Sequence, residues 1–262
     1  MLSQLWDNPI FVRTRQVEER TLGSGARAYL QRYGAGLAIL FGPLGLYLLF
    51  STDHWCNPAR VLESLGGLLN FSAVLMVLYI TSRALNGTFS AITLEREQKT
   101  YDTLVSTNLT GSELLWGKAA SGLWPVVREL CLVAPLALGL GVLAGYPVEA
   151  VAYLALCLAC LGFFGATGLA MSYASNSTQH ATRRGTALAG FFMLGGPMLD
   201  WFLYGLTRGE TFTPMATYLS PLAAAISVPS SELWAGSLVL YMVGTVLLWK
   251  MLGKMAESAR VR

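Results

Sequence analysis

The chain has 262 residues, of which 54% are hydrophobic and 13% are charged, and its mean hydropathy is +0.51. An ordinary soluble domain carries about 25% charged residues, and it could not bury this much apolar surface. The composition excludes a soluble enzyme, a disordered regulator and a disulfide-rich secreted domain, and it predicts an integral membrane protein. The net charge of +3 is too small to indicate a nucleic-acid-binding protein.

The first 28 residues predict a cytoplasmic amphipathic interface segment. Apolar residues alternate with Arg13, Arg15 and Arg20, and Pro9 suits the first position of a helix. We expect this helix to lie on the membrane surface, with arginines toward lipid headgroups and apolar side chains toward acyl chains. A partly ordered basic tail is the alternative. Because no continuous apolar core precedes a cleavage site, we expect no cleaved signal peptide.

Residues 29–262 predict one all-α transmembrane domain of six helices. A helix that crosses a bilayer needs roughly 20 mostly apolar residues, and lipid offers the backbone no hydrogen-bond partner, so each span must be helical. The six apolar stretches are 29–50, 62–81, 123–144, 148–174, 186–206 and 233–249.

Positive charge predicts the orientation of these spans, because Lys and Arg gather in cytoplasmic loops. With the N-terminus inside, 16 of the 18 Lys and Arg residues lie on the cytoplasmic side. Only Arg60 and Arg208 lie outside. We therefore predict that both termini are cytoplasmic.

The cytoplasmic loop 83–118 holds the most polar long segment, LEREQKTYDTLVSTNLTGSELLWGK at 94–118. Tyr101, Leu104, Val105 and Asn108 repeat with helical spacing, which indicates a short helix with one docking face. Thr110 and Glu113 match a capping box and predict the start of the third spanning helix. The segment also carries closely spaced charges of both signs, which suit a partner protein. A solvated hairpin without a partner is the alternative.

This segment resembles bacterial ATP-binding-cassette exporter permeases of the ABC-2 class. After their second span these proteins carry a pattern like E-x-E-x-G-T-x-E-x-L-x-x-T-P, then an acidic residue and G-K. The chain departs from the pattern at Lys99 for Gly, Asp102 for Glu and Asn108 for Pro. The matching residues are Glu95, Glu97, Thr100, Asp102, Leu104, Thr107, Glu113, Gly117 and Lys118. The six-span plan and the amphipathic start also resemble that family.

The resemblance implies a multi-pass permease subunit of the bacterial cytoplasmic (inner) membrane. Two such chains, identical or paralogous, would form the pathway, and each would dock a cytoplasmic ATPase through a coupling helix in this loop. The docking residues implied are Glu95, Arg96, Glu97, Thr100, Asp102 and Leu104. Gly117 and Lys118 would mark the start of the third helix, and 175–185 would offer a second contact or simply carry topogenic charge.

No ATPase site is predicted in this chain, so ATP and magnesium would belong to the partner. A Walker A loop needs four residues between its glycines and Ser or Thr after its lysine. The nearest lookalike, 111–118, has five intervening residues and is followed by Ala119. It also lies on predicted helix.

Polar residues also occur within the apolar stretches. Arg128, Glu129 and Asp200 are candidates for the pathway or for contacts between helices, since charges at membrane depth usually face a cavity or a partner. The alternative is that they are interfacial. Gly42-Pro43 and Gly196-Pro197 can kink their helices. In the outer loop 207–232, the apolar run 215–228 is too short to span and predicts a re-entrant or interfacial segment.

Two other functions compete with the exporter permease. One is a non-transporting membrane subunit that anchors or regulates an ATPase complex. The other is a membrane-embedded enzyme, but the chain contains neither H-E-x-x-H nor G-x-S-x-G, and we assign no catalytic residue. Cys157 and Cys160 lie in an apolar run without two further ligands, so we also expect no metal site.

Overall fold

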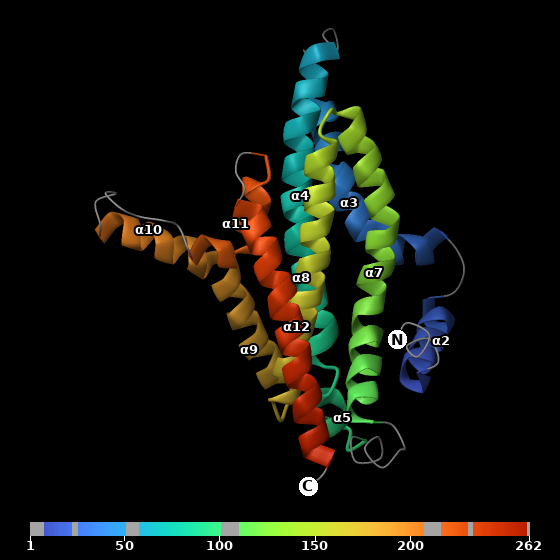
Figure 1. Cartoon of the computed structure of the whole chain (residues 1–262). Helices are drawn as coiled ribbons and strands as arrows, with labels where there is room; N and C mark the ends of the chain where they lie inside the picture. Colours follow the sequence, from blue (N-terminus) through green and yellow to red (C-terminus); the bar gives the residue numbers. More distant parts are fainter. Residues whose placement is uncertain are drawn as a thin grey trace.

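The structure is a computed structural model that describes residues 8–22, 26–50, 58–100, 110–206, 216–229 and 233–260. All regular elements in these ranges are helical (Figure 1). They are α2 (Pro9–Leu22), α3 (Ala26–Phe50), α4 (Pro58–Phe89), α5 (Thr93–Glu97), α7 (Gly111–Leu143), α8 (Pro147–Tyr173), α9 (Thr178–Gly190), the π-helix η1 (Phe191–Gly195), α10 (Gly196–Leu206), the 3-10 helix η2 (Ala216–Leu219), α11 (Pro221–Ser227) and α12 (Leu233–Arg260).

Five helical stretches in the described residues are long and apolar enough to cross a membrane. They are Ser64–Glu97, Gly111–Leu143, Pro147–Tyr173, Thr178–Leu206 and Leu233–Glu257. The apolar part of α3, Tyr33–Tyr47, is shorter. The chain is thus a multi-pass membrane protein that is all-helical in its described residues, and five of the six predicted spans coincide with stretches of sufficient length.

The helix boundaries refine the expected spans. α7 begins at Gly111, and Thr110 caps it in the predicted capping box. The Thr110 hydroxyl accepts from the Glu113 N–H at 3.2 Å, and the Glu113 carboxylate accepts from the Thr110 N–H at 2.8 Å. At 33 residues, α7 is about 50 Å long at 1.5 Å per residue. It therefore extends well beyond a hydrocarbon core of about 30 Å.

The fifth expected span is interrupted. α9 follows the bundle, η1 adds a π-helical turn at Phe191–Gly195, and α10 then turns away from the other helices (Figure 1). Gly196 and Pro197 open α10, so the predicted Gly-Pro kink falls at this change of direction. The aromatic rings of Phe163 and Phe164 on α8 hold Phe192 of η1 edge to face, with centroids 5.4 and 5.9 Å apart.

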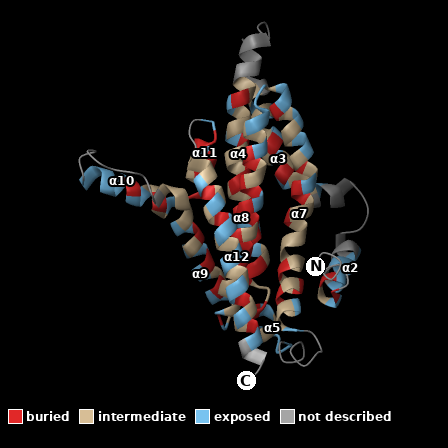
Figure 2. Cartoon of the chain, viewed as in Figure 1, coloured by how far each residue is buried: buried red, intermediate tan, exposed pale blue. Residues whose placement is uncertain are grey.

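The core forms around α8, which packs against α4, α7 and α12 (Figure 2). Buried side chains run along its length, with Leu156, Phe164 and Leu169 completely enclosed. Glycines allow close crossings: a side chain at Gly87 or Gly122 would meet the backbone of the other glycine, so α4 and α7 touch through their main chains there. Small residues of this kind let membrane helices approach closely.

Two short predicted segments are helical and packed. α2 begins at Pro9 as expected, with the Asn8 side chain accepting from the Ile10 N–H at 3.0 Å. Phe11 is buried and meets Trp124 of α7 edge to face, so part of its apolar face covers protein rather than lipid. In the segment expected as an outer loop, α11 packs against α4 and α12, with Ala224 and Ala225 buried.

Candidate functional site at the α5 end of the bundle

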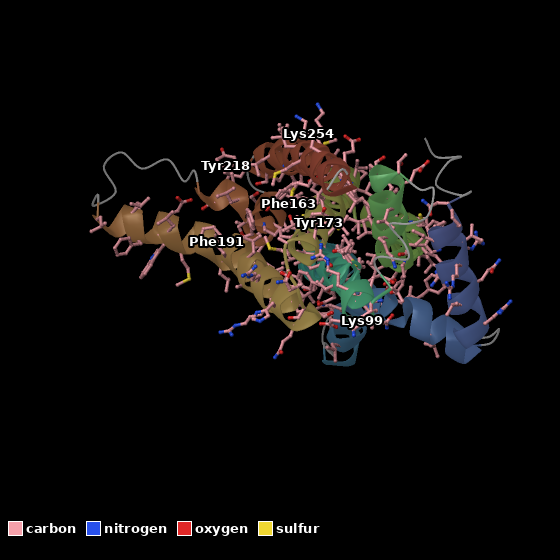
Figure 3. All side chains as sticks on the ribbon, turned by 90° about the horizontal axis from the view of Figure 1, so that it is seen from below. Lys99, Phe163, Tyr173, Phe191, Tyr218 and Lys254 are labelled. Carbon is pink, nitrogen blue, oxygen red and sulfur yellow. The ribbon has the colours of Figure 1, made fainter. Side chains whose placement is uncertain are left out.

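α5 contacts the start of α7 and the start of α9. The last turns of α12 pack at the same end of the bundle, where Leu252 and Ala256 join a buried cluster with Ile92. We call this region the α5 end (Figure 3). α5 closes with two backbone hydrogen bonds. The Thr100 N–H donates to the Glu95 carbonyl at 2.9 Å, and the Lys99 N–H donates to the Arg96 carbonyl at 3.1 Å. This pair of bonds is the Schellman arrangement that ends many helices.

Lys99 occupies the left-handed position of this turn, with φ 57°. Glycine is the usual residue there because a Cβ atom is strained at positive φ. It is also the position at which the exporter pattern carries glycine. Lys99 therefore bears the conformational strain of this turn.

We expect Lys99→Gly to stabilise the folded chain by about 0.5–1 kcal/mol, because it relieves the left-handed strain. Gln98→Gly is the matched control. Gln98 has φ −79° and no such strain, so glycine there should destabilise through the added freedom of the unfolded chain. Thermal unfolding of the detergent-purified variants checks this, and equal shifts for both substitutions would contradict it.

The Glu95 carboxylate joins α5 to α7. It forms a salt bridge with Lys118 and accepts from the Thr100 hydroxyl. Partial burial raises the pKa of Glu95, but the bonds from Lys118 and Thr100 outweigh that effect, and the pKa lies below its ordinary value of 4.5. Glu95 lies beyond the end of α4, so this carboxylate belongs to the polar end of the bundle. Three residues that match the exporter pattern, Glu95, Thr100 and Lys118, are thus in contact.

The depressed pKa of Glu95 predicts a pH dependence of stability. The unfolded chain takes up a proton first as pH falls, so the stabilisation is complete above about pH 4.5 and declines below it. Lys118→Met keeps the apolar stem but removes the charge. We expect it to lower the unfolding midpoint at pH 7, and we expect its difference from wild type to shrink as the pH falls below about 4.5. A difference that does not change with pH would contradict this reading.

Arg96 and Glu97 join α5 to the α8–α9 connection. One Arg96 guanidinium nitrogen donates to the carbonyls of Tyr173 and Ser175 at 3.0 and 2.9 Å. Its guanidinium lies 5.4 Å from the Tyr173 ring centre. Glu97 accepts from the Thr178 N–H at 2.6 Å and from its hydroxyl at 2.9 Å. A carboxylate in this place caps α9 and complements its dipole.

Ser172 of α8 completes the connection from the other side. Its hydroxyl accepts from the N–H groups of Ile92 and Thr93 at 2.9 and 3.2 Å. These N–H groups lie at the N-terminus of α5, and the apolar side chain of Ile92 at the N-cap position cannot accept hydrogen bonds from them. The Ser172 hydroxyl therefore attaches the start of α5 to the end of α8.

Gly117 has a steric role. A Cβ atom there would lie 2.7 Å from the Asn8 side-chain oxygen, and Asn8 also donates to the Glu113 carbonyl at 2.9 Å. Gly117 thus lets the start of α2 seat against α7. Asp102 and Leu104, the remaining predicted docking residues, lie outside the described residues, as does the helix expected over 101–108.

Arg128 and Glu129 bring three helices together farther along α7. Glu129 is buried, and its two carboxylate oxygens accept from the Gly36 N–H of α3 at 2.7 Å and from the Tyr79 hydroxyl of α4 at 2.8 Å. The Arg128 guanidinium lies 5.6 Å from the ring centre of Tyr33, within range of a cation–π interaction. These are contacts between helices, which is one of the two roles predicted from the sequence.

Asp200 connects α10 to η2. Its carboxylate is buried and accepts from both the N–H and the hydroxyl of Thr217 at 2.5 Å. The Ser220 hydroxyl adds a bond to the Met193 carbonyl at 2.7 Å. Together they attach the segment around η2 to the interrupted helix.

Sequence reasoning missed several partners of these residues, namely Asn8, Gly36, Tyr79, Ser172, Thr178 and Thr217. Ser177 and Thr178 lie in a short polar stretch after an apolar helix, which is a usual place for the N-cap of the next helix. That signal could have identified the helix start, but not its carboxylate partner. Among the described residues, no group of three or more His, Cys, Asp or Glu side chains could hold a metal ion.

Comparison with known proteins gives no match: neither a family model nor a curated protein matches the chain.

Proposed function

We propose that this chain is the transmembrane permease subunit of an ATP-driven exporter of the ABC-2 type. In this proposal it has six spans with both termini inside, in a bacterial cytoplasmic membrane. A second copy or a paralogue supplies the other half of the pathway, and a separate cytoplasmic ATPase binds ATP and magnesium. The residues at membrane depth, Arg128 and Glu129, hold the helices that border this pathway.

One observation carries the proposal: residues of the exporter pattern that are far apart in sequence converge at the α5 end. Glu95, Thr100 and Lys118 form one contact, and Lys99 takes the glycine conformation. A chance match in sequence would not be expected to bring a residue of α7, Lys118, into contact with the turn that ends α5. The convergence supports a shared local structure, and the shared structure supports a shared role.

The contacts also divide the predicted docking residues into two groups. Glu95, Arg96, Glu97 and Thr100 bind within the chain, so in our proposal they position the following segment rather than touch the ATPase. In our proposal the contact with the ATPase then falls to 101–109, with Asp102 and Leu104, and to the side chain of Leu94, which is 44% exposed.

The test is co-purification of the tagged chain from native membranes in mild detergent. We expect a Walker-containing polypeptide with wild type and its loss with Leu104→Asp. Lys254→Ala is the control, since Lys254 is an exposed residue of α12 near the same end. A second permease in the same sample would show whether the dimer is mixed.

If no ATPase accompanies the wild-type chain from membranes in which its assembly is intact, the proposal fails. If an ATPase binds, reconstitution in vesicles separates a permease from a subunit that only anchors the ATPase. ATP-dependent movement of solute supports the permease, and ATP hydrolysis without movement supports the anchoring subunit.

A further inference from the structure

A cavity lies between α3, α4, α7 and α8, beside the turn that joins α7 to α8. It encloses about 50 Å³. Most of its walls are apolar and come from all four helices, with Leu40, Met76, Val133 and Cys157 among the buried contributors. The glycines at its edge fit tightly against neighbours: a Cβ atom at Gly141 would lie 2.5 Å from the Ala150 side chain.

The polar side chains that line this apolar space are those of Asn70, Ser72, Tyr146, Glu149 and Tyr153. The Ser72 hydroxyl donates to the Leu40 carbonyl at 3.3 Å. Tyr153 is buried and donates its hydroxyl to the Asn70 side-chain oxygen at 3.3 Å. Glu149 is half-buried in the first turn of α8, one turn before Tyr153. Within the described part of the chain, no Lys, Arg or His lies within ion-pair distance of Glu149.

A carboxylate beside an apolar cavity favours a positive charge. Removing a carboxylate from water is costly unless a cation or hydrogen-bond donors compensate. The α8 N-terminus supplies part of that compensation. The Asn70 oxygen retains a second lone pair, and the Tyr153 oxygen can also accept. Glu149 is the one charged residue among the described residues that line the cavity. The site therefore favours a positively charged group that donates hydrogen bonds.

We propose that this cavity binds an alkylammonium group, with its charge against Glu149 and Asn70 and its alkyl part in the apolar space. An ammonium group has three donors and no acceptor. An engineered apolar cavity of about 150 Å³ admits benzene, and this cavity is about a third of that size. The enclosed part therefore fits a short unbranched chain rather than a ring.

The alkylammonium group has two sources, a free amine or the ethanolamine headgroup of a membrane lipid. The test begins with the full chain purified in detergent and stripped of lipid. n-Propylammonium is the probe, and n-propanol is its neutral counterpart of equal chain length. We expect propylammonium to raise the thermal unfolding midpoint in a saturable manner, and propanol to do so only weakly.

Glu149→Gln removes the charge while keeping the shape. We expect it to weaken propylammonium binding by about tenfold to a hundredfold, the range for a hydrogen bond to a charged group, and to leave the propanol response unchanged. Glu257→Gln is the control, since Glu257 is exposed on α12. Ala73→Leu fills the cavity and should abolish the response to both compounds.

Equal responses to propylammonium and propanol in wild type, or an unchanged response in Glu149→Gln, overturn the proposal. If that variant fails to fold, equilibrium dialysis of labelled propylammonium against wild type decides it: saturation near one equivalent supports the site, and its absence refutes it. Nanodiscs of phosphatidylethanolamine or phosphatidylglycerol distinguish the sources. If the site holds the ethanolamine headgroup, propylammonium should bind more weakly in phosphatidylethanolamine nanodiscs than in phosphatidylglycerol nanodiscs. Equal binding in the two kinds of nanodisc assigns a free amine.

Discussion

Gly122→Leu is expected to separate α4 from α7 and to lower the free energy of unfolding by more than about 4 kcal/mol, an exceptional effect for one substitution. A Cβ atom at Gly122 would lie 2.2 Å from the Gly87 carbonyl oxygen. The obstacle is backbone, so no side-chain rotation can relieve it. The helices must move apart, and the packing around their crossing is lost. Thermal or denaturant unfolding in detergent measures the loss.

Gly139→Leu is the matched control for this prediction. Gly139 lies on the same helix, and a Cβ atom there meets nothing within 4 Å. Leucine at that position should be neutral or stabilising, because glycine costs about 1 kcal/mol relative to alanine within a helix. Similar losses in both variants would show that α7 tolerates no larger residue anywhere, and the crossing with Gly87 would not be the cause.

Glu129→Ala is expected to lower the free energy of unfolding by about 3 kcal/mol. The substitution removes the acceptor of the Gly36 N–H and of the Tyr79 hydroxyl at a buried site. Buried donors left without a partner cost about 1–3 kcal/mol each. Glu129→Gln keeps the shape and one good acceptor oxygen, so we expect a smaller loss.

A double-mutant cycle with Tyr79→Phe tests the mechanism. If the Tyr79 hydroxyl acts through Glu129, its removal should cost less in the Glu129→Ala background than in wild type. Strictly additive losses would mean that the two residues act independently, and the three-helix contact would then need another explanation.

The sequence was informative where a signal is local. Apolar stretches predicted five helices that are long and apolar enough to cross a membrane, because hydrocarbon demands long apolar helices. The capping box at Thr110 and the proline at position 9 located two helix starts, since each satisfies backbone groups within one turn. The resemblance to the exporter pattern stays a prediction, although the lysine that replaces its glycine adopts a positive φ of 57°.

The sequence was uninformative where partners are distant. Nothing near Glu97 shows that it caps α9, and nothing near Glu129 points to Gly36, 93 positions away. The interruption at η1 was also missed, because the run from Phe191 to Leu206 has the composition of an uninterrupted span. Its change of direction depends on contacts with α8 and on the attachment of Asp200 to Thr217.

The bonds between α5 and the α8–α9 connection bear on the order in which the chain assembles. The residues that cap and hold α5, from Ser172 to Thr178, follow it by about 80 positions. During synthesis, α5 must therefore remain without these partners until α7 and α8 have been made and placed. Its final hydrogen bonds can form only when most of the domain is present. The α5 end can therefore complete these hydrogen bonds only after α7 and α8 have been inserted, and the bonds report that those two helices are in place.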